Sequence, residues 1–140
     1  MLVLDTDHLT EYQKGTSTES LRLKERLDQA TETFATTIIT VEEIMRGWMA
    51  AVRRVHDPHR QITAYARLQH LFRFFATWSV LPWNEAAAQT FDSLKLARIR
   101  VGTMDLKIAS IVLANNATLL TRNRNDFDKV SGLRSEDWLS

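Results

Sequence analysis

Short apolar runs alternate along this chain with longer stretches in which apolar residues recur at helical spacing. The runs are short enough to be buried strands, and TFATTIIT at 33–40 is the richest of them in β-branched residues. We therefore predict strands at 2–4, 33–40, 79–83 and 117–121, and a last short strand in GLRSEDW. The stretches between the strands predict helices at 5–14, 16–30, 84–100 and 104–115. Strands that alternate with helices imply a parallel sheet with helices on both faces.

The middle of the chain departs from this alternation, because two long helical patterns follow each other directly. Apolar residues keep helical spacing from Val41 as far as HDPH at 56–59, and they resume it from Gln61 to Trp78. We expect a helical hairpin over 41–78. Its second half is crowded with aromatic side chains, which are typical of a core but in this number also fit an exposed partner groove or a dimer face.

Composition places the chain among ordinary globular domains. Its 140 residues suit one domain, 1–140, and 44% of them are apolar while 25% are charged. No apolar run approaches the roughly 20 residues that a membrane span requires. No internal repeat or linker divides the sequence. We therefore expect one domain with no membrane partner.

The first residues and the absence of cysteine bear on the compartment. The chain passes from Met1 directly into LVLD, without the basic and apolar segments of a secretory leader. With no cysteine, neither disulfides nor thiolate metal ligands are available. We expect a cytoplasmic protein.

The formal net charge of +1 is too small to attract a polyanion through the field of the whole molecule. Such a partner would have to be held by local basic patches, of which the sequence has three: 53–60, 95–100 and 121–124. Each patch taken alone also fits an ordinary solvated face.

Acidic residues follow several of the predicted strands. Asp5 and Asp7 come just after the first strand, Glu43 lies one helical turn beyond the second, Asp105 opens the helix after VGT, and Asp126 follows the strand ATLLT. The carboxyl ends of parallel strands form one edge of a sheet, where ligands bind. We therefore expect these carboxylates to meet.

Carboxylates brought together in this way need a counter-charge. Two of them about 5 Å apart repel by roughly 3 kcal/mol at an effective dielectric of ~20. Because the chain has no cysteine and no paired histidines, the cation that fits is Mg²⁺ or Mn²⁺, which prefer oxygen ligands and keep several waters. An open site of this kind beside basic residues suits the hydrolysis of phosphodiesters.

Most of these acids also have a purely structural interpretation. Thr40 and Glu43 match a capping box, Asp105 stands in a first helical turn where a carboxylate is favoured, and Asp7 can cap the first helix. Asp126 can be a turn residue in NRNDF. The strongest individual case for function is the acid that closes the first apolar strand.

The four histidines do not form a metal-ligand spacing with one another. We interpret His56 and His59 as loop residues beside a proline and His70 as a residue on a helix surface. His8, next to the acids, is the one histidine that we keep as a helper of the site.

Four segments, taken in order, resemble the PIN-domain ribonucleases of the VapC toxin type. The segments are LVLDTDHL, TTIITVEEIMRG, GTMDLKIASIVLANNATLLTRNRNDFDKVSGL and SEDW, and together they cover nearly the whole chain. The resemblance implies a three-layer α/β/α sandwich with a central parallel sheet, here with a protruding helical hairpin. It also implies an endoribonuclease dependent on Mg²⁺ or Mn²⁺, acting as the toxin of a VapBC-type toxin–antitoxin system.

The same resemblance implies partners. The substrate would be RNA, and a cognate antitoxin would inhibit the enzyme. We expect the antitoxin to bind through the hairpin 41–78, where Met45 and Arg46 lie on a face that its segment can enter. We also expect a homodimer.

The family's catalytic and metal-binding acids carry over onto Asp5, Glu43 and Asp105. Family members place the fourth acid at one of two positions, either directly after TR or in the later DF. Here Asn123 occupies the first place and Asp126 the second. The chain also has an acid at position 7, Asp7, where the family often has asparagine. We take Asp126 as the fourth acid, with Asp7 and Asn123 as helpers.

Two other classes of function compete with this interpretation. A strand followed by DxD also opens the phosphatases of the haloacid dehalogenase type, with Asp5 as nucleophile and Asp7 as acid. That assignment leaves Glu43 without a task, and MDLK does not match that family well. Alternatively, the fold is a binding module for RNA or antitoxin without turnover.

Overall fold

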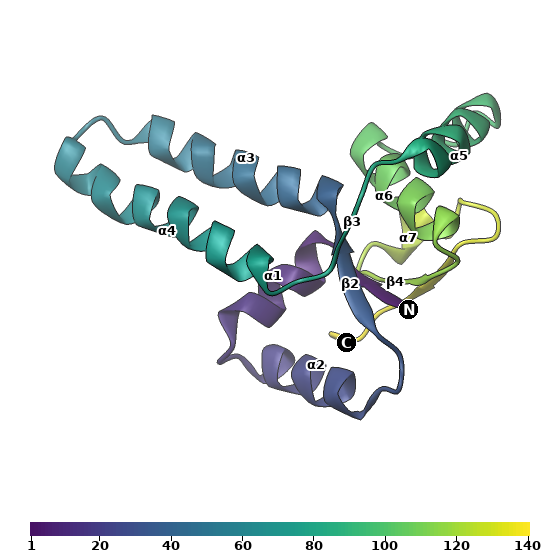
Figure 1. Ribbon diagram of the computed structural model, residues 1–140, viewed down its shortest axis with the longest axis horizontal. Coiled ribbons are helices and arrows are strands. Elements are labelled where there is room, and N and C mark those ends of the chain that lie inside the picture. The colour runs from purple at the N-terminus through teal and green to yellow at the C-terminus, as the bar shows by residue number, and fades with distance from the viewer.

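The computed structural model describes residues 1–140 and is built around a five-stranded parallel sheet in the order β3-β2-β1-β4-β5 (Figure 1). The strands are β1 (Leu2–Leu4), β2 (Phe34–Thr37), β3 (Val80–Leu81), β4 (Thr118–Leu120) and β5 (Arg134–Glu136). Every neighbouring pair is parallel. The parallel sheet that the alternating pattern predicts is therefore confirmed.

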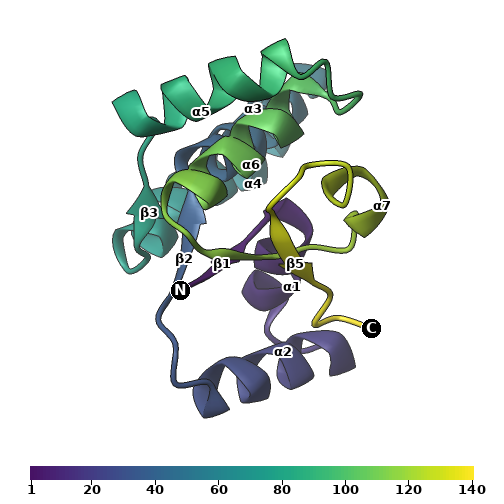
Figure 2. The same ribbon diagram turned by 90° about the vertical axis from the view of Figure 1, so that its right-hand side faces the viewer.

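Seven helices surround the sheet. They are α1 (Thr6–Lys14), α2 (Thr18–Gln29), α3 (Ile38–Arg54), α4 (Pro58–Ala76), α5 (Glu85–Leu96), α6 (Thr103–Ala114) and α7 (Arg124–Phe127). In Figure 2, α5 and α6 lie on one side of the sheet and α2 on the other. The predicted three-layer α/β/α sandwich is confirmed. No helix is both long enough and apolar enough to cross a membrane.

The central strand β1 explains how the layers are held together. Successive side chains of a strand point to opposite faces. Leu2 and Leu4 pack in a cluster with residues of α1 and α2, whereas Val3 packs in a second cluster with residues of α5 and α6. All three side chains are buried. A strand that is covered on both faces is apolar at every position. Because β1 ends at Leu4, the next residue, Asp5, lies at the carboxyl edge of the sheet.

The predicted hairpin is present and projects from the sandwich as α3 and α4 (Figure 1). Its bounds differ from the prediction, because α3 begins before Val41 and α4 begins at Pro58. Proline suits the first turn of a helix, and Asp57 caps this one by accepting from His59 N at 2.9 Å. His59 is therefore helical, and its predicted place in a loop is wrong.

The second strand is shorter than predicted and ends at Thr37. Thr37 is the N-cap of α3, because its Oγ1 accepts from Thr40 N at 3.1 Å. This hydroxyl cap outweighs the strand preference of the β-branched residues that follow, so they join the helix. The capping box expected between Thr40 and Glu43 is therefore wrong, which leaves the Glu43 carboxylate without a capping role.

Candidate active site

A cavity of about 370 Å³ lies where β1 and β4 end, between α1, α3 and α6. Five of the predicted site residues line it: Asp5, Asp7, Glu43, Asp105 and Asn123. Its other lining residues are Thr6, Thr10, Glu11, Ile108, Arg122 and Phe127. The fold therefore brings carboxylates from three separate parts of the sequence to one cavity, as the strand order implies.

Asp5 is the N-cap of α1 and the most deeply buried of these acids. Its Oδ1 accepts from His8 N at 3.3 Å, and only 6% of the residue is exposed. Burial raises the pKa of Asp5 to about 7, against the opposing effect of the hydrogen bond from His8. The expectation that Asp7 caps this helix is wrong, because Asp5 holds that position.

Asp7 lies in the first turn of α1 and has the opposite electrostatic behaviour. Its Oδ1 is 2.7 Å from Nδ1 of His8, and its Oδ2 accepts from Arg122 N at 3.4 Å. Burial acts to raise its pKa, but hydrogen bonds with His8 and Asp5 outweigh burial and lower the pKa of Asp7 to about 2. Of the two neighbouring aspartates, Asp7 is therefore the one that stays ionised at neutral pH.

Glu43 reaches the cavity from the second turn of α3. Its Oε1 is buried and makes no well-formed hydrogen bond, and the same holds for Oγ1 of Thr6, although the Thr6 side chain lies near enough to act to lower the pKa of Glu43. Burial, followed by the charge of Asp105, raises the pKa of Glu43. A buried carboxylate oxygen without a partner is costly, so this atom is the clearest sign that the cavity takes a ligand.

Asp105 stands in the first turn of α6, and Asn123 connects it to Asp126. The Asn123 amide nitrogen donates to Oδ2 of Asp105 at 3.3 Å and to Oδ2 of Asp126 at 3.1 Å. Burial, followed by the charge of Asp126, raises the pKa of Asp105. Asp126 itself does not line the cavity, and hydrogen bonds from Asn123 and Lys129 lower its pKa. It therefore meets the other acids through Asn123.

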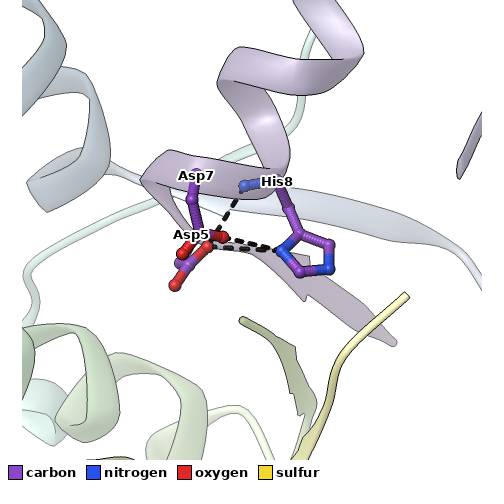
Figure 3. Close-up of side chains that lie close together, drawn as sticks. All are labelled: Asp5, Asp7 and His8. Atoms are coloured by element: carbon purple, nitrogen blue, oxygen red, sulfur yellow. Dashed lines mark hydrogen bonds and ion pairs between the residues drawn. The ribbon is translucent and has the colours of Figure 1, made fainter. Parts of the chain in front are cut away.

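The acids are spread around the cavity rather than packed at one point. Asp5, Asp7 and His8 form the one group whose possible ligand atoms all lie within 4.8 Å of one another (Figure 3). Glu43 and Asp105 line the same cavity outside that group. This spacing suits a cation that keeps several of its own waters between protein ligands.

The donor set fits a hard divalent cation on three observations. The groups that could ligate a metal in the cavity are carboxylates, one buried carboxylate oxygen lacks a partner, and the pKa values of Asp5, Glu43 and Asp105 are all raised. Burial is the largest cause in all three cases, and for Glu43 and Asp105 it is followed by repulsion from another acid, so a bound cation would favour the ionised forms. Oxygen ligands of this kind favour Mg²⁺ or Mn²⁺ over the softer metals.

The sequence underestimated His8 and Arg122. The His8 side chain is completely buried beside both aspartates, although the sequence suggested only a helper. The sequence feature that could have indicated this role is the position of His8, three residues after the N-cap Asp5 and in the helical turn that follows β1. Arg122 lines the cavity as a member of the basic patch 121–124, which taken alone also fitted a solvated face.

Fold and site together define a class: parallel α/β domains with a carboxylate-lined cavity at the carboxyl edge of the sheet. A sequence model of the PIN domain family matches residues 2–133. The chain belongs to the PIN domain family. This membership confirms the predicted resemblance and overturns the alternative of a haloacid dehalogenase phosphatase.

Individual relatives agree with the family assignment. Ribonuclease VapC1 of Rickettsia felis is 28% identical over 99 residues, which cover 68% of this chain and 69% of the relative. A structure of VapBC-1 from nontypeable Haemophilus influenzae matches with a TM-score of 0.70 and 24% identity, covering 99% of this chain and 98% of the other. A toxin–antitoxin complex from Klebsiella pneumoniae matches with a TM-score of 0.66 and 20% identity, covering 95% of each chain.

Proposed function

We propose that this chain is a metal-dependent endoribonuclease, the toxin of a VapBC-type toxin–antitoxin system. The observation that carries the proposal is the cavity lined by Asp5, Glu43 and Asp105, in which a buried Glu43 oxygen lacks any partner. Family membership and the likeness to Ribonuclease VapC1 support RNA as the substrate. We also infer that the protein acts in the cytoplasm.

Asp5, Glu43 and Asp105 would hold Mg²⁺ or Mn²⁺, and Asp126 would act as the fourth acid through Asn123. When bound, the cation activates water and neutralises charge that develops on the phosphate. The chain's own residues prepare the site for it. Asn123 holds two carboxylates at fixed positions, which limits the rearrangement needed when the cation binds.

Arg122 is the one arginine or lysine among the residues that line the cavity. Its backbone N–H donates to Oδ2 of Asp7 at 3.4 Å. A guanidinium group can donate two parallel hydrogen bonds to phosphate oxygens. We assign to Arg122 the binding of the phosphate next to the bond that is cut.

The direct test is incubation of the purified protein with total cellular RNA in Mn²⁺ or in EDTA, followed by mapping of the cleaved ends. We expect defined cuts in Mn²⁺ and none in EDTA. Asp92→Asn, on the exposed face of α5, is a matched control that should cut like the parent protein. A protein that binds RNA without cutting it in either condition would support the binding-module alternative.

The antitoxin is proposed to bind along the hairpin. A groove of about 770 Å³ lies between α1, α3 and α4, lined in part by Trp48, Ile62 and Leu71. Thr10 lines both this groove and the acidic cavity. A segment that fills the groove can therefore continue into the active site and block it. Met45 does not line this groove, so the path differs from the one that the sequence suggested.

A second apolar surface supports the proposed homodimer. Ile38, Met45 and Trp83 are among the residues that line a cavity of about 420 Å³ between the start of α3 and α6. Ile38 and Trp83 are 40% and 36% exposed. We propose that two copies meet at this face. Sedimentation of Trp83→Glu should give a monomer where the parent protein gives a dimer.

A further inference from the structure

His8 connects the acids of the cavity to the last residues of the chain. On one side its Nδ1 lies 2.7 Å from Asp7 Oδ1 and 3.7 Å from Asp5 Oδ1 (Figure 3). On the other side its Nε2 accepts a hydrogen bond from the backbone N–H of Trp138 at 3.1 Å, 130 residues along the chain, and lies 3.7 Å from Oδ1 of Asp137. The imidazole is completely buried between these partners.

For a neutral ring, these contacts assign the proton to one nitrogen. A backbone N–H can only donate, so Nε2 must present its lone pair to Trp138. The proton of the neutral ring therefore sits on Nδ1 and is donated to Asp7. Although Asp5, Asp7 and His8 are close enough to share a metal ion, Nδ1 in this tautomer has no lone pair to offer. The His8 ring acts here as a donor to the Asp7 carboxylate, while its backbone N–H donates to Asp5.

Residues 136–140 are fixed firmly enough to impose this arrangement. The indole Nε1–H of Trp138 donates to Glu136 Oε2 at 2.7 Å, and the guanidinium of Arg26 lies 4.2 Å from the centre of a Trp138 ring. Leu139 packs in the same core cluster as Leu9 of α1. The contacts of Glu136 and Leu139, which lie on either side of Trp138 in the chain, therefore hold the Trp138 N–H against His8.

We propose that His8 is a positioning residue of the nuclease site, held as its Nδ1–H tautomer by Trp138 so that it aligns the carboxylates of Asp7 and Asp5 with the cavity. The proposal rests on the proposed function. It gives the SEDW segment a role in the active site, although its residues do not line the cavity. Groups that orient metal-binding side chains typically contribute 10- to 100-fold to metal affinity or activity.

A matched pair of variants separates positioning from the filling of space. His8→Leu keeps a bulky side chain but has no donor, whereas His8→Asn leaves a gap and keeps an amide N–H at the place of Nδ1. Positioning predicts that Leu weakens Mn²⁺ binding and kcat by about 10-fold or more, while Asn stays within a few-fold of the parent protein. If His8 only fills space, His8→Asn should weaken Mn²⁺ binding and kcat more than His8→Leu does. His59→Leu, on the exposed start of α4, is the control.

The tautomer can be measured without any RNA. In ¹⁵N spectra of the histidine rings at pH 8, the signals that disappear in His8→Asn should show a protonated Nδ1 and an unprotonated Nε2. Trp138→Pro removes the N–H donor and should alter these signals, while Trp138→Phe keeps the donor and should preserve them. A protonated Nε2 in the parent protein would overturn the proposal.

Calorimetry with Mn²⁺ distinguishes failure of this proposal from failure of the proposed function. If no protein cuts RNA, but His8→Leu loses Mn²⁺ affinity and His8→Asn keeps it, the RNA assignment fails and the positioning role stands. If His8→Leu binds Mn²⁺ and cuts RNA like the parent protein, the positioning role is wrong.

Discussion

At the scale of single residues, two opposing effects act on the ionisation of the Asp5 carboxylate. It follows a strand buried on both faces, so its carboxylate is desolvated, whereas the proposed function requires it to present an ionised oxygen to a cation. Burial raises its pKa to about 7, whereas that of its neighbour Asp7 falls to about 2. The metal-free protein therefore carries unfavourable charge at Asp5 above neutral pH.

This conflict predicts how stability depends on pH. With a folded pKa of about 7 and a reference value of 3.8, Asp5 binds more protons in the folded state than in the unfolded state between these values. Its contribution to stability is therefore present below pH 4 and is lost as pH rises to 7. Asp5→Asn should stabilise the metal-free protein at pH 8 by roughly 1–4 kcal/mol. Urea unfolding at pH 5 and pH 8 measures this, and a variant less stable than its parent at pH 8 would contradict it.

Asn123 allows a second prediction at this scale. Because it donates to both Asp105 and Asp126, its removal frees two carboxylates that repel each other. We expect Asn123→Ala to lower kcat by about 10-fold while the protein still folds. Asn125→Ala, exposed on the same short helix α7, serves as the control. Equal rates for the two variants would remove Asn123 from the site.

At the scale of elements, the sequence predicted which segments form helices and strands better than where they begin. Thr37 shows why, because a strand and a helix N-cap both favour threonine and only the contact with Thr40 N decides between them. Gly15 is the opposite case. Its φ of +76° is favourable for glycine, so the presence of glycine at this position predicts the end of α1 from the sequence.

At the scale of elements, the proposed binding of the antitoxin in the hairpin groove can be tested. Ile62 on α4 lines the groove and is 65% exposed, so a charge there would face any bound apolar segment. Ile62→Glu should abolish inhibition by a co-expressed antitoxin while RNA cleavage by the free toxin is unchanged. Phe72→Glu is the matched control, because Phe72 is 62% exposed on α4 but does not line the groove. Equal inhibition of both variants would place the antitoxin elsewhere.

At the scale of the whole molecule, the order of strands determined how much of the site could be foreseen. Parallel strands end at one edge, so the acids after β1 and β2 were expected to meet, and Asp5, Asp7 and Glu43 line one cavity. The bridge from His8 to Trp138 was not foreseeable, because it joins residues 130 positions apart through a backbone N–H. The position of Asp126 outside the cavity likewise depends on the short helix α7, which the sequence did not predict.

The cavity should also couple metal binding to the stability of the whole domain. A ligand that binds only the folded state stabilises it by about 2.7 kcal/mol at a hundredfold excess over Kd. Mn²⁺ should therefore raise Tm of the parent protein, and Glu43→Gln, which removes the charge beside the unpartnered oxygen, should reduce the shift. A melting temperature independent of Mn²⁺ would mean that the cavity holds no such ion.

The most direct test of the central claim compares RNA cleavage by the parent protein and by Asp105→Asn in Mn²⁺, with EDTA as the blank. Burial and the charges of Asp126 and Asp7 disfavour the ionised form of Asp105, so its replacement by asparagine should leave the fold intact. We predict defined cuts by the parent protein and at least a hundredfold lower rate for the variant, with cleavage abolished by EDTA. Cleavage at the parent rate by folded Asp105→Asn, or cleavage that persists in EDTA, would contradict a carboxylate-held cation as the basis of activity.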